Sequence, residues 1–190
     1  MKAIATFSRD SLNPLVRRVG ALLGLILPGS HRVTHARQVP APFDAGKRWV
    51  LLPILNHSGA PQAGERVESI LDALLPDAGL AGVQLYPASD TIDSLPELNG
   101  RLLYERSLAW ARGNGYALGI SGSVDEWGYQ NGVDGEPAVA VNVQVVEIAS
   151  GNVLWNATGA RSGWGRETLK GTAKKLLRDL LATMHVRQEN

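Results

Sequence analysis

Histidine and serine are the side chains of this sequence that could serve as base and nucleophile. His57 and Ser58 are adjacent in a polar stretch, and the run from Gly119 to Ser123 reads Gly-Ile-Ser-Gly-Ser, which is close to a nucleophile elbow. Adjacent side chains on an extended segment point apart, so His57 needs a third partner before it can activate a serine. The Gly119–Ser123 run lacks the final glycine of an elbow and falls within a predicted strand. We therefore predict no catalytic site.

Metal and cofactor chemistry is not indicated either. The chain has no cysteine, which removes disulfides, thiolate catalysis and cysteine zinc sites. Residues 113–115, Gly-Asn-Gly, lead from a predicted helix into a strand, whereas a phosphate-binding loop leads from strand to helix. The four histidines show no metal-ligand spacing; they are His31, His35, His57 and His185.

The first 36 residues have the pattern of an export leader. Basic residues precede a short apolar run over 19–27, which is too short to span a bilayer and ends at Pro28-Gly29. Thr34-His35-Ala36 offers small residues for cleavage. An amphipathic N-terminal helix of a cytosolic protein is the alternative interpretation.

Loss of the leader would change the charge balance. It removes five of the 19 lysines and arginines and one of the 18 acidic residues, which leaves 14 basic residues against 17 acidic ones. The one dense basic run that remains is in the last predicted helix, over 170–178. Since nucleic-acid binding usually needs a clustered basic face, we predict no nucleic-acid partner.

After the leader, the predicted elements first alternate between strand and helix and then form a meander of three strands. After a linker over 37–47, residues 49–55 are apolar on both faces, which predicts a central strand. Valines at every second position over 139–145 predict a strand with one buried face. The elements expected around these are a helix over 67–75, a strand over 83–86, a loop over 90–100, a helix over 102–113, strands over 116–129, 138–148 and 152–161, and a helix over 169–181.

This order, β-α-β-α-β-β-β-α, predicts one domain of the α/β (α+β) class over residues 48–187. Its mixed β-sheet would carry helices packed on it.

Several short motifs resemble a group of bacterial envelope proteins. The runs 115–124 and 150–156 resemble the amino-terminal domain of TolB and the periplasmic domain of the curli secretion channel. Within that group, Asp125-Glu126-Trp127-Gly128-Tyr129, the turn over 132–137 and the loop with Trp164 are most similar to the PelC family of Pel exopolysaccharide export. The resemblance covers residues 47–185. That family is typically lipidated, but the lipobox-like Leu27-Pro28-Gly29-Ser30 has serine in place of the cysteine.

The resemblance implies a homo-oligomeric ring of twelve subunits at the periplasmic face of the outer membrane. Its partners would be the secretion barrel PelB, the inner leaflet of the outer membrane and a cationic exopolysaccharide. Weak contacts with many carboxylates would concentrate such a polymer without holding it. The carboxylates that this implies for the polymer path are Asp125, Glu126, Asp134 and Glu136. A hairpin loop that only needs solubility is the alternative for each of them.

Tryptophans divide into two kinds. Trp164 lies among glycines, where an amphipathic ring suits a membrane interface, and the matching loop of the PelC family implies contact with the outer membrane. The alternative is that Trp164 folds back on the last helix. Trp49, Trp110 and Trp155 are expected in the core, and Trp127 in the core or at a subunit interface.

Two other functional classes stay open. One is a monomeric periplasmic binding module of the same fold, a scaffold or activator of an envelope synthase. The other is an envelope hydrolase, which would need a pocket with a perturbed acid or base.

Overall fold

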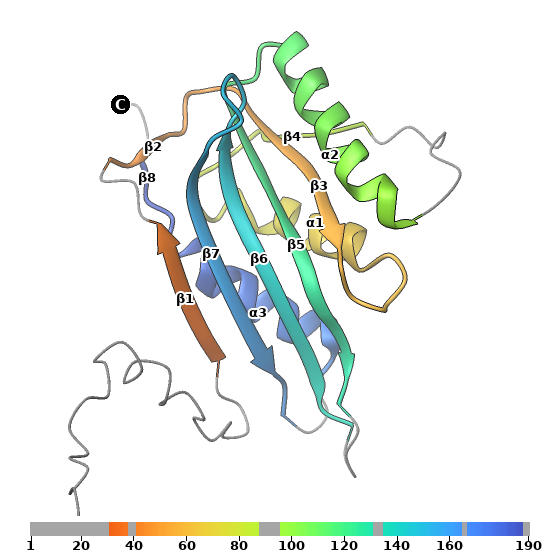
Figure 1. Ribbon diagram of the computed structural model, residues 1–190. Helices are drawn as coiled ribbons and strands as arrows, with labels where there is room; N and C mark the ends of the chain where they lie inside the picture. Colours follow the sequence, from red (N-terminus) through yellow and green to blue (C-terminus); the bar gives the residue numbers. More distant parts are fainter. Residues whose placement is uncertain (1–30, 38–40, 88–95, 131–134, 165–166, 188–190) are drawn as a thin grey trace, which may run out of the picture.

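The computed structural model describes residues 31–37, 41–87, 96–130, 135–164 and 167–187. A six-stranded mixed sheet has the order β1-β7-β6-β5-β3-β4, and β2 pairs with β8 in a separate two-stranded sheet (Figure 1). The elements in chain order are β1 (His31–Arg37), β2 (Phe43–Asp44), β3 (Trp49–Asn56), α1 (Ala63–Leu74), β4 (Gln84–Leu85), α2 (Pro96–Gly113), β5 (Leu118–Tyr129), β6 (Pro137–Glu147), β7 (Val153–Ser162), α3 (Leu169–Leu181) and β8 (Val186–Arg187).

The predicted fold class is confirmed, and the predicted strands and helices from β3 to α3 are all present. The predicted loop over 90–100 is wrong in its last part, because α2 begins at Pro96. β3 is parallel to β4 and β5, whereas β5, β6 and β7 form an antiparallel meander, and β1 pairs antiparallel with the outer side of β7. Three short or terminal strands, β1, β2 and β8, had no counterpart in the prediction. β1 lies within the predicted leader and β2 within the predicted linker.

Two helices cover one face of the sheet. α1 and α3 carry apolar residues at helical spacing, such as Ile70 and Leu71 in α1 and Leu176 and Leu177 in α3, and these are buried. The alternating valines of β6, Val139 to Val145, point into this main core and are at most 1% exposed. Thr168 caps α3, because its hydroxyl accepts a hydrogen bond from the Gly171 N–H at 3.1 Å.

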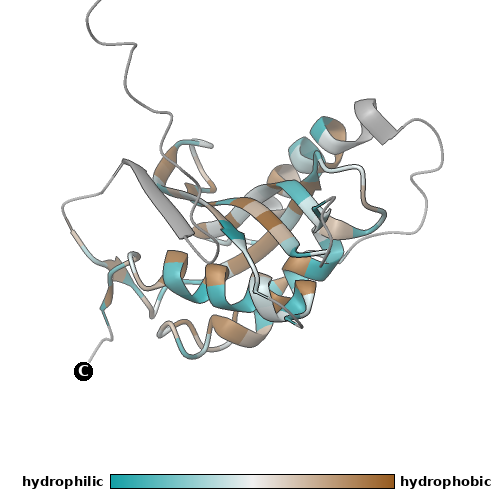
Figure 2. Ribbon diagram, turned by 90° about the horizontal axis from the view of Figure 1, so that it is seen from below, coloured by the Kyte–Doolittle hydropathy of each residue, from teal (hydrophilic) through white to brown (hydrophobic). Residues whose placement is uncertain are grey.

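The other face is covered only in part. α2 packs on β3, where Val50 and Leu52 form a second small core with Ala111 and Ile148. Figure 2 shows α2 on one side of the sheet and α1 with α3 on the opposite side. On this face Ser121 and Val146 are still buried, at most 1% exposed, whereas Asn142 is half-buried and Thr158 is exposed. The strip from Ser123 to Thr158 has no helix of the described ranges packed on it, and it is the open part of this face.

A proline breaks the regular pairing of β3. Pro53 has no N–H to donate, and the register between β3 and β5 shifts between Leu51 and Ile54. The Ile54 N–H donates instead to the Glu68 side chain of α1 at 2.8 Å. α1 comes this close because Gly64 has no side chain, and a Cβ there would collide with the Ile54 carbonyl. Burial raises the pKa of the Glu68 carboxyl.

Candidate functional site

A β-bulge presents two neighbouring carboxylates. Val124 pairs with Val141 and Glu126 pairs with Ala140, so Asp125 is an extra residue in β5. Consecutive residues of a regular strand face opposite sides of the sheet, but the extra residue lets both Asp125 and Glu126 be exposed. The structure thus brings together two of the four predicted polymer-path residues.

Of the other two predicted carboxylates, the structure describes Glu136 alone. Glu136 is half-buried just before β6, and its carbonyl accepts a hydrogen bond from the Gln130 N–H at 2.8 Å. Asp134 lies outside the described residues. The hairpin pairing of Tyr129 with Pro137 places Glu136 farther along the strands than Asp125 and Glu126.

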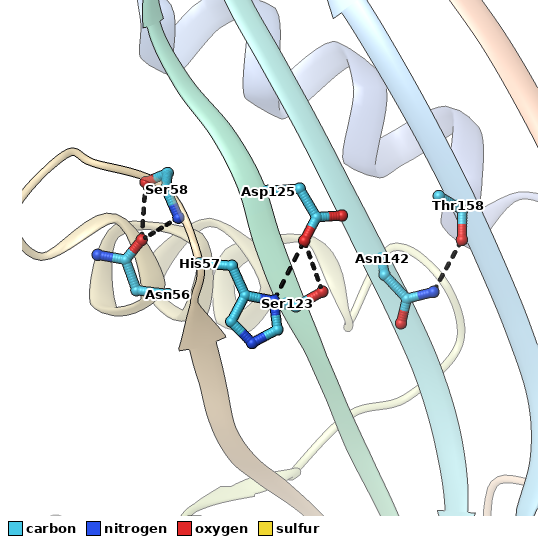
Figure 3. Close-up of polar contacts among 7 residues, drawn as sticks. All are labelled: Asn56, His57, Ser58, Ser123, Asp125, Asn142 and Thr158. Atoms are coloured by element: carbon cyan, nitrogen blue, oxygen red, sulfur yellow. Dashed lines mark hydrogen bonds and ion pairs between the residues drawn. The ribbon is translucent and has the colours of Figure 1, made fainter. Parts of the chain in front are cut away.

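Asp125 is held by a histidine and a serine. His57 Nδ1 lies 3.3 Å from Asp125 Oδ1, and the Ser123 hydroxyl donates to the same oxygen at 3.3 Å (Figure 3). His57 is brought to β5 by its own N–H, which donates to the Val124 carbonyl at 2.8 Å. The side chains of His57 and Asp125 are 58% and 50% exposed. The pair is therefore open to solvent.

These contacts do not have the order of a Ser-His-Asp relay. In such a relay the histidine accepts the serine proton, whereas here Ser123 and His57 both contact one carboxylate oxygen. Ser58 is turned away: its N–H and its hydroxyl both donate to Asn56 Oδ1, at 3.0 and 2.7 Å. The arrangement fixes the direction of a carboxylate and does not activate a serine.

A row of polar side chains continues from Ser123 across the open face. Ser123 pairs with Asn142, and Asn142 pairs with Thr158, so the three lie side by side on β5, β6 and β7. Asn142 Nδ2 donates to the Thr158 hydroxyl at 2.8 Å (Figure 3). This row and the His57 contact were not predicted, because both join residues that are far apart in the sequence. The polar residues Ser123 in β5 and Asn142 in β6 were the sequence features from which the row could have been predicted.

Trp164 projects from the loop between β7 and α3. Its side chain is 66% exposed, as the sequence predicts. The backbone N–H of Trp164 donates to Glu167 Oε2 at 3.4 Å, and Glu167 Oε1 lies 2.6 Å from Lys175 Nζ. The hydrogen bond from Lys175 is the largest factor that lowers the pKa of Glu167. The membrane contact itself remains a prediction.

Gly163 fixes where this loop leaves the sheet. The Gly163 N–H donates to the Pro137 carbonyl at 2.7 Å. A Cβ on Gly163 would collide with the Pro137 ring and would lie 2.6 Å from the Thr172 hydroxyl. The Trp164 loop is therefore seated against the start of β6 and the first turn of α3. Figure 1 shows that the β5–β6 hairpin and the end of β7 lie at the same lower end of the sheet.

The other tryptophans are buried or partly buried. Trp49 and Trp155 are 4% and 3% exposed in the main core, as predicted. Trp110, which was predicted to lie in the core, is instead half-buried beside the small second core, in contact with the rings of Tyr86 and Tyr116 at centroid distances of 5.4 Å in each case. Trp127 is 7% exposed and belongs to the main core. This burial accounts for Trp127 within its own subunit, and an interface role for it remains a prediction.

A groove of about 460 Å³ lies between the first halves of α1 and α3. Trp127 and Ile70 form part of its apolar lining, and Gln62 at its edge has a left-handed backbone with φ 57°. The full lining is Gln62, Glu65, Arg66, Ser69, Ile70, Trp127, Leu169 and Lys170. The groove lies on the helical face, away from the polar row. Only the apolar positions of the two helices pointed to this groove in the sequence.

Within the described ranges, no three histidine or acidic side chains come together as a metal site. The same residues include no helix that is long and apolar enough to cross a membrane.

Comparison with known proteins gives a clear structural match. No protein-family model and no curated protein matches the chain. The solved structure of a PelC dodecamer from Paraburkholderia phytofirmans is 33% identical, with a TM-score of 0.68, and the match covers 84% of this chain and 100% of that chain. A variant of the same dodecamer is also 33% identical, covers 84% and 99% of the two chains and has a TM-score of 0.66. A lipoprotein from Neisseria meningitidis is 14% identical, covers 74% and 99%, and has a TM-score of 0.44.

Proposed function

The chain belongs to the PelC family, and we propose that it forms a closed ring in the periplasm, at the outer membrane. This ring would guide an exopolysaccharide toward its export barrel. The proposal rests on one observation. The chain is 33% identical to PelC from Paraburkholderia phytofirmans over the whole length of that protein's solved chain, and that protein is a dodecamer. A closed ring needs two different surfaces on each subunit that meet head to tail around an axis. The opposite faces of this sheet, one open and one helical, are different in this way.

Electrostatic attraction is the proposed means of guiding the polymer. Asp125 and Glu126 are exposed on one bulge, and a ring would repeat this pair in every subunit. A polymer with free amines is cationic, so a ring of carboxylates would raise its local concentration. Many weak contacts of this kind are entered and left easily, which transport requires. Glu136 would extend the acidic path along the same hairpin, and Asp134 remains a predicted member of that path.

Attachment to the inner leaflet of the outer membrane is proposed to involve Trp164. An exposed indole binds a bilayer weakly by itself, but several copies in one plane bind together with much higher avidity. PelB is the proposed barrel partner because the family serves Pel export. A catalytic step is not part of the proposal, and the contacts of Ser123, His57 and Asp125 support that choice.

The mass of the native assembly tests the proposal. The full chain is expressed in a Gram-negative host, extracted from the envelope in mild detergent and measured by native mass spectrometry and light scattering. We expect one discrete species with the mass of about twelve subunits, in line with the closed symmetry of most oligomers. A monomer at micromolar concentration would contradict the ring and favour the monomeric binding module.

A further inference from the structure

β1 is part of the main sheet. It pairs antiparallel with β7 along its length, from His31 opposite Arg161 to Arg37 opposite Asn156. Figure 1 shows β1 as the outer strand on that side, with α3 behind it. The edge strand of the sheet on this side is therefore β1 and not β7.

Cleavage at the predicted site would remove this strand. The predicted leader ends at Ala36, so a cut there leaves only Arg37 of the seven residues of β1. β7, a strand of 10 residues, would then be the edge of the sheet. A long open edge exposes a row of unpaired N–H and C=O groups, which favours aggregation and wrong strand pairing.

The structural match also includes this region. It covers 84% of the present chain, which is more than residues 37–190 can supply. The aligned part must therefore begin before Arg37. Since 100% of the solved PelC chain is covered, that chain also has residues in the region of β1.

We infer that the leader is removed ahead of His31, so that β1 remains in the mature protein and seals the edge of β7. This inference rests on the proposed export of the chain but not on the ring or on the polymer. It also places the new N-terminus. His31 lies opposite Arg161, three residues before Trp164 in the sequence, so the mature chain begins at the same end of the sheet as the Trp164 loop.

The N-terminus of the exported protein tests this directly. The full chain is expressed with a C-terminal tag in a Gram-negative host, and the envelope fraction is analysed by intact mass and by N-terminal peptide sequencing. We expect a chain that starts at His31 or a few residues before it. A start at Arg37 or later, or an intact chain that starts at Met1, would overturn the inference.

Matched variants of the two possible cleavage regions sharpen the test. Signal peptidases need small residues before the cut. Ala36→Leu should therefore leave processing unchanged, whereas Gly29→Leu combined with Ser30→Leu should accumulate the unprocessed chain. The opposite pattern would place the cut after Ala36 and overturn the inference. A correctly processed monomer would leave the inference standing and contradict only the proposed ring.

Discussion

Lys175 Nζ lies 2.6 Å from Glu167 Oε1, and this ion pair joins α3 to the loop that carries Trp164. The second oxygen of Glu167 accepts the Trp164 N–H at 3.4 Å, so one carboxylate connects a helix to an exposed loop. The Lys175 side chain is 52% exposed and that of Glu167 is 18% exposed, so the pair is shielded mainly on the Glu167 side.

Replacement of Lys175 by methionine should loosen the Trp164 loop while the fold is kept. The pKa of Glu167 is lowered chiefly by the hydrogen bond from Lys175, so the variant should raise it toward the ordinary carboxyl value. A lowered carboxyl pKa stabilises the folded state above pH 4.5, and this contribution disappears as pH falls through the folded-state pKa. We expect a loss of roughly 1 kcal/mol or less at pH 7, which vanishes in acid. Chemical denaturation at several pH values measures this loss of stability.

Lys174→Met, an exposed neighbour on α3, is the control. An equal loss of stability in Lys174→Met would contradict the stabilising role of the ion pair between Lys175 and Glu167.

The contribution of Glu68 to the free energy of unfolding should change with pH in the opposite direction. Burial raises its pKa, so the folded state keeps the proton to higher pH than the unfolded state does. The free energy of unfolding should therefore fall as pH rises from the ordinary carboxyl range through the raised pKa. Glu68→Gln keeps an oxygen for the Ile54 N–H and removes the charge, so this fall should be absent. Denaturation at several pH values checks it, with Asp72→Asn, an exposed site on α1, as the control. If the free energy of unfolding falls with pH as steeply in Glu68→Gln as in the wild type, Glu68 is not the group responsible.

Gly163→Ala should destabilise the fold. The new Cβ would meet Pro137 and the Thr172 hydroxyl, and relief of such overlap costs about 1–3 kcal/mol. Gly128→Ala is a matched control in β5, because a Cβ there meets nothing within 4 Å. Thermal unfolding of the two variants compares them. Equal melting temperatures would show that the Trp164 loop is not seated as described.

Trp164→Ala should leave stability within about 0.5 kcal/mol, because the side chain is 66% exposed. We expect the variant to keep its oligomer and to lose its binding to lipid vesicles in a flotation assay. Tyr129→Ala is the matched control, since Tyr129 is also a large side chain at that end of the sheet and is 57% exposed. Unfolding of Trp164→Ala, or vesicle binding equal to that of the wild type, would contradict the membrane role.

Replacement of Asp125 and Glu126 by lysine should reverse the charge of the bulge without unfolding the protein, because both side chains are exposed. In a strain that depends on this chain, polymer export should be lost while the protein level and native mass stay the same. Asp77→Lys, an exposed site after α1, is the control. Normal export in the double variant would remove these residues from the polymer path.

Periodicity predicts most of this fold because most elements have one buried face. The leucine spacing of α3 and the alternating valines of β6 identify both elements without knowledge of their partners. β2 and β8 have two residues each, which is too short for a period to be visible. α2 begins at Pro96 inside the predicted loop over 90–100, since proline is well suited to the first turn of a helix.

The site was predicted less completely than the fold. Exposure of Trp164 follows from local sequence, since its glycine neighbours favour a projecting loop. The bulge that exposes both Asp125 and Glu126 does not follow from local sequence, because regular strand alternation would turn one of the two to the other face. The contact between His57 and Asp125 joins residues 68 positions apart, and it exists only because β3 and β5 are parallel neighbours. β1 was missed for a different reason, because its basic and small residues also fit the end of an export leader.

The β5–β6 hairpin, the Trp164 loop and the start of β1 all lie at one end of the sheet. Rotation about a single axis never turns a subunit upside down, so a ring of this chain would have two chemically distinct rims. All copies of the hairpin would lie at one height along the axis and at one distance from it, and the same holds for the indoles and for the chain starts. The assembly would thus have a built-in polarity, fixed by the strand directions of a single subunit before any partner is met.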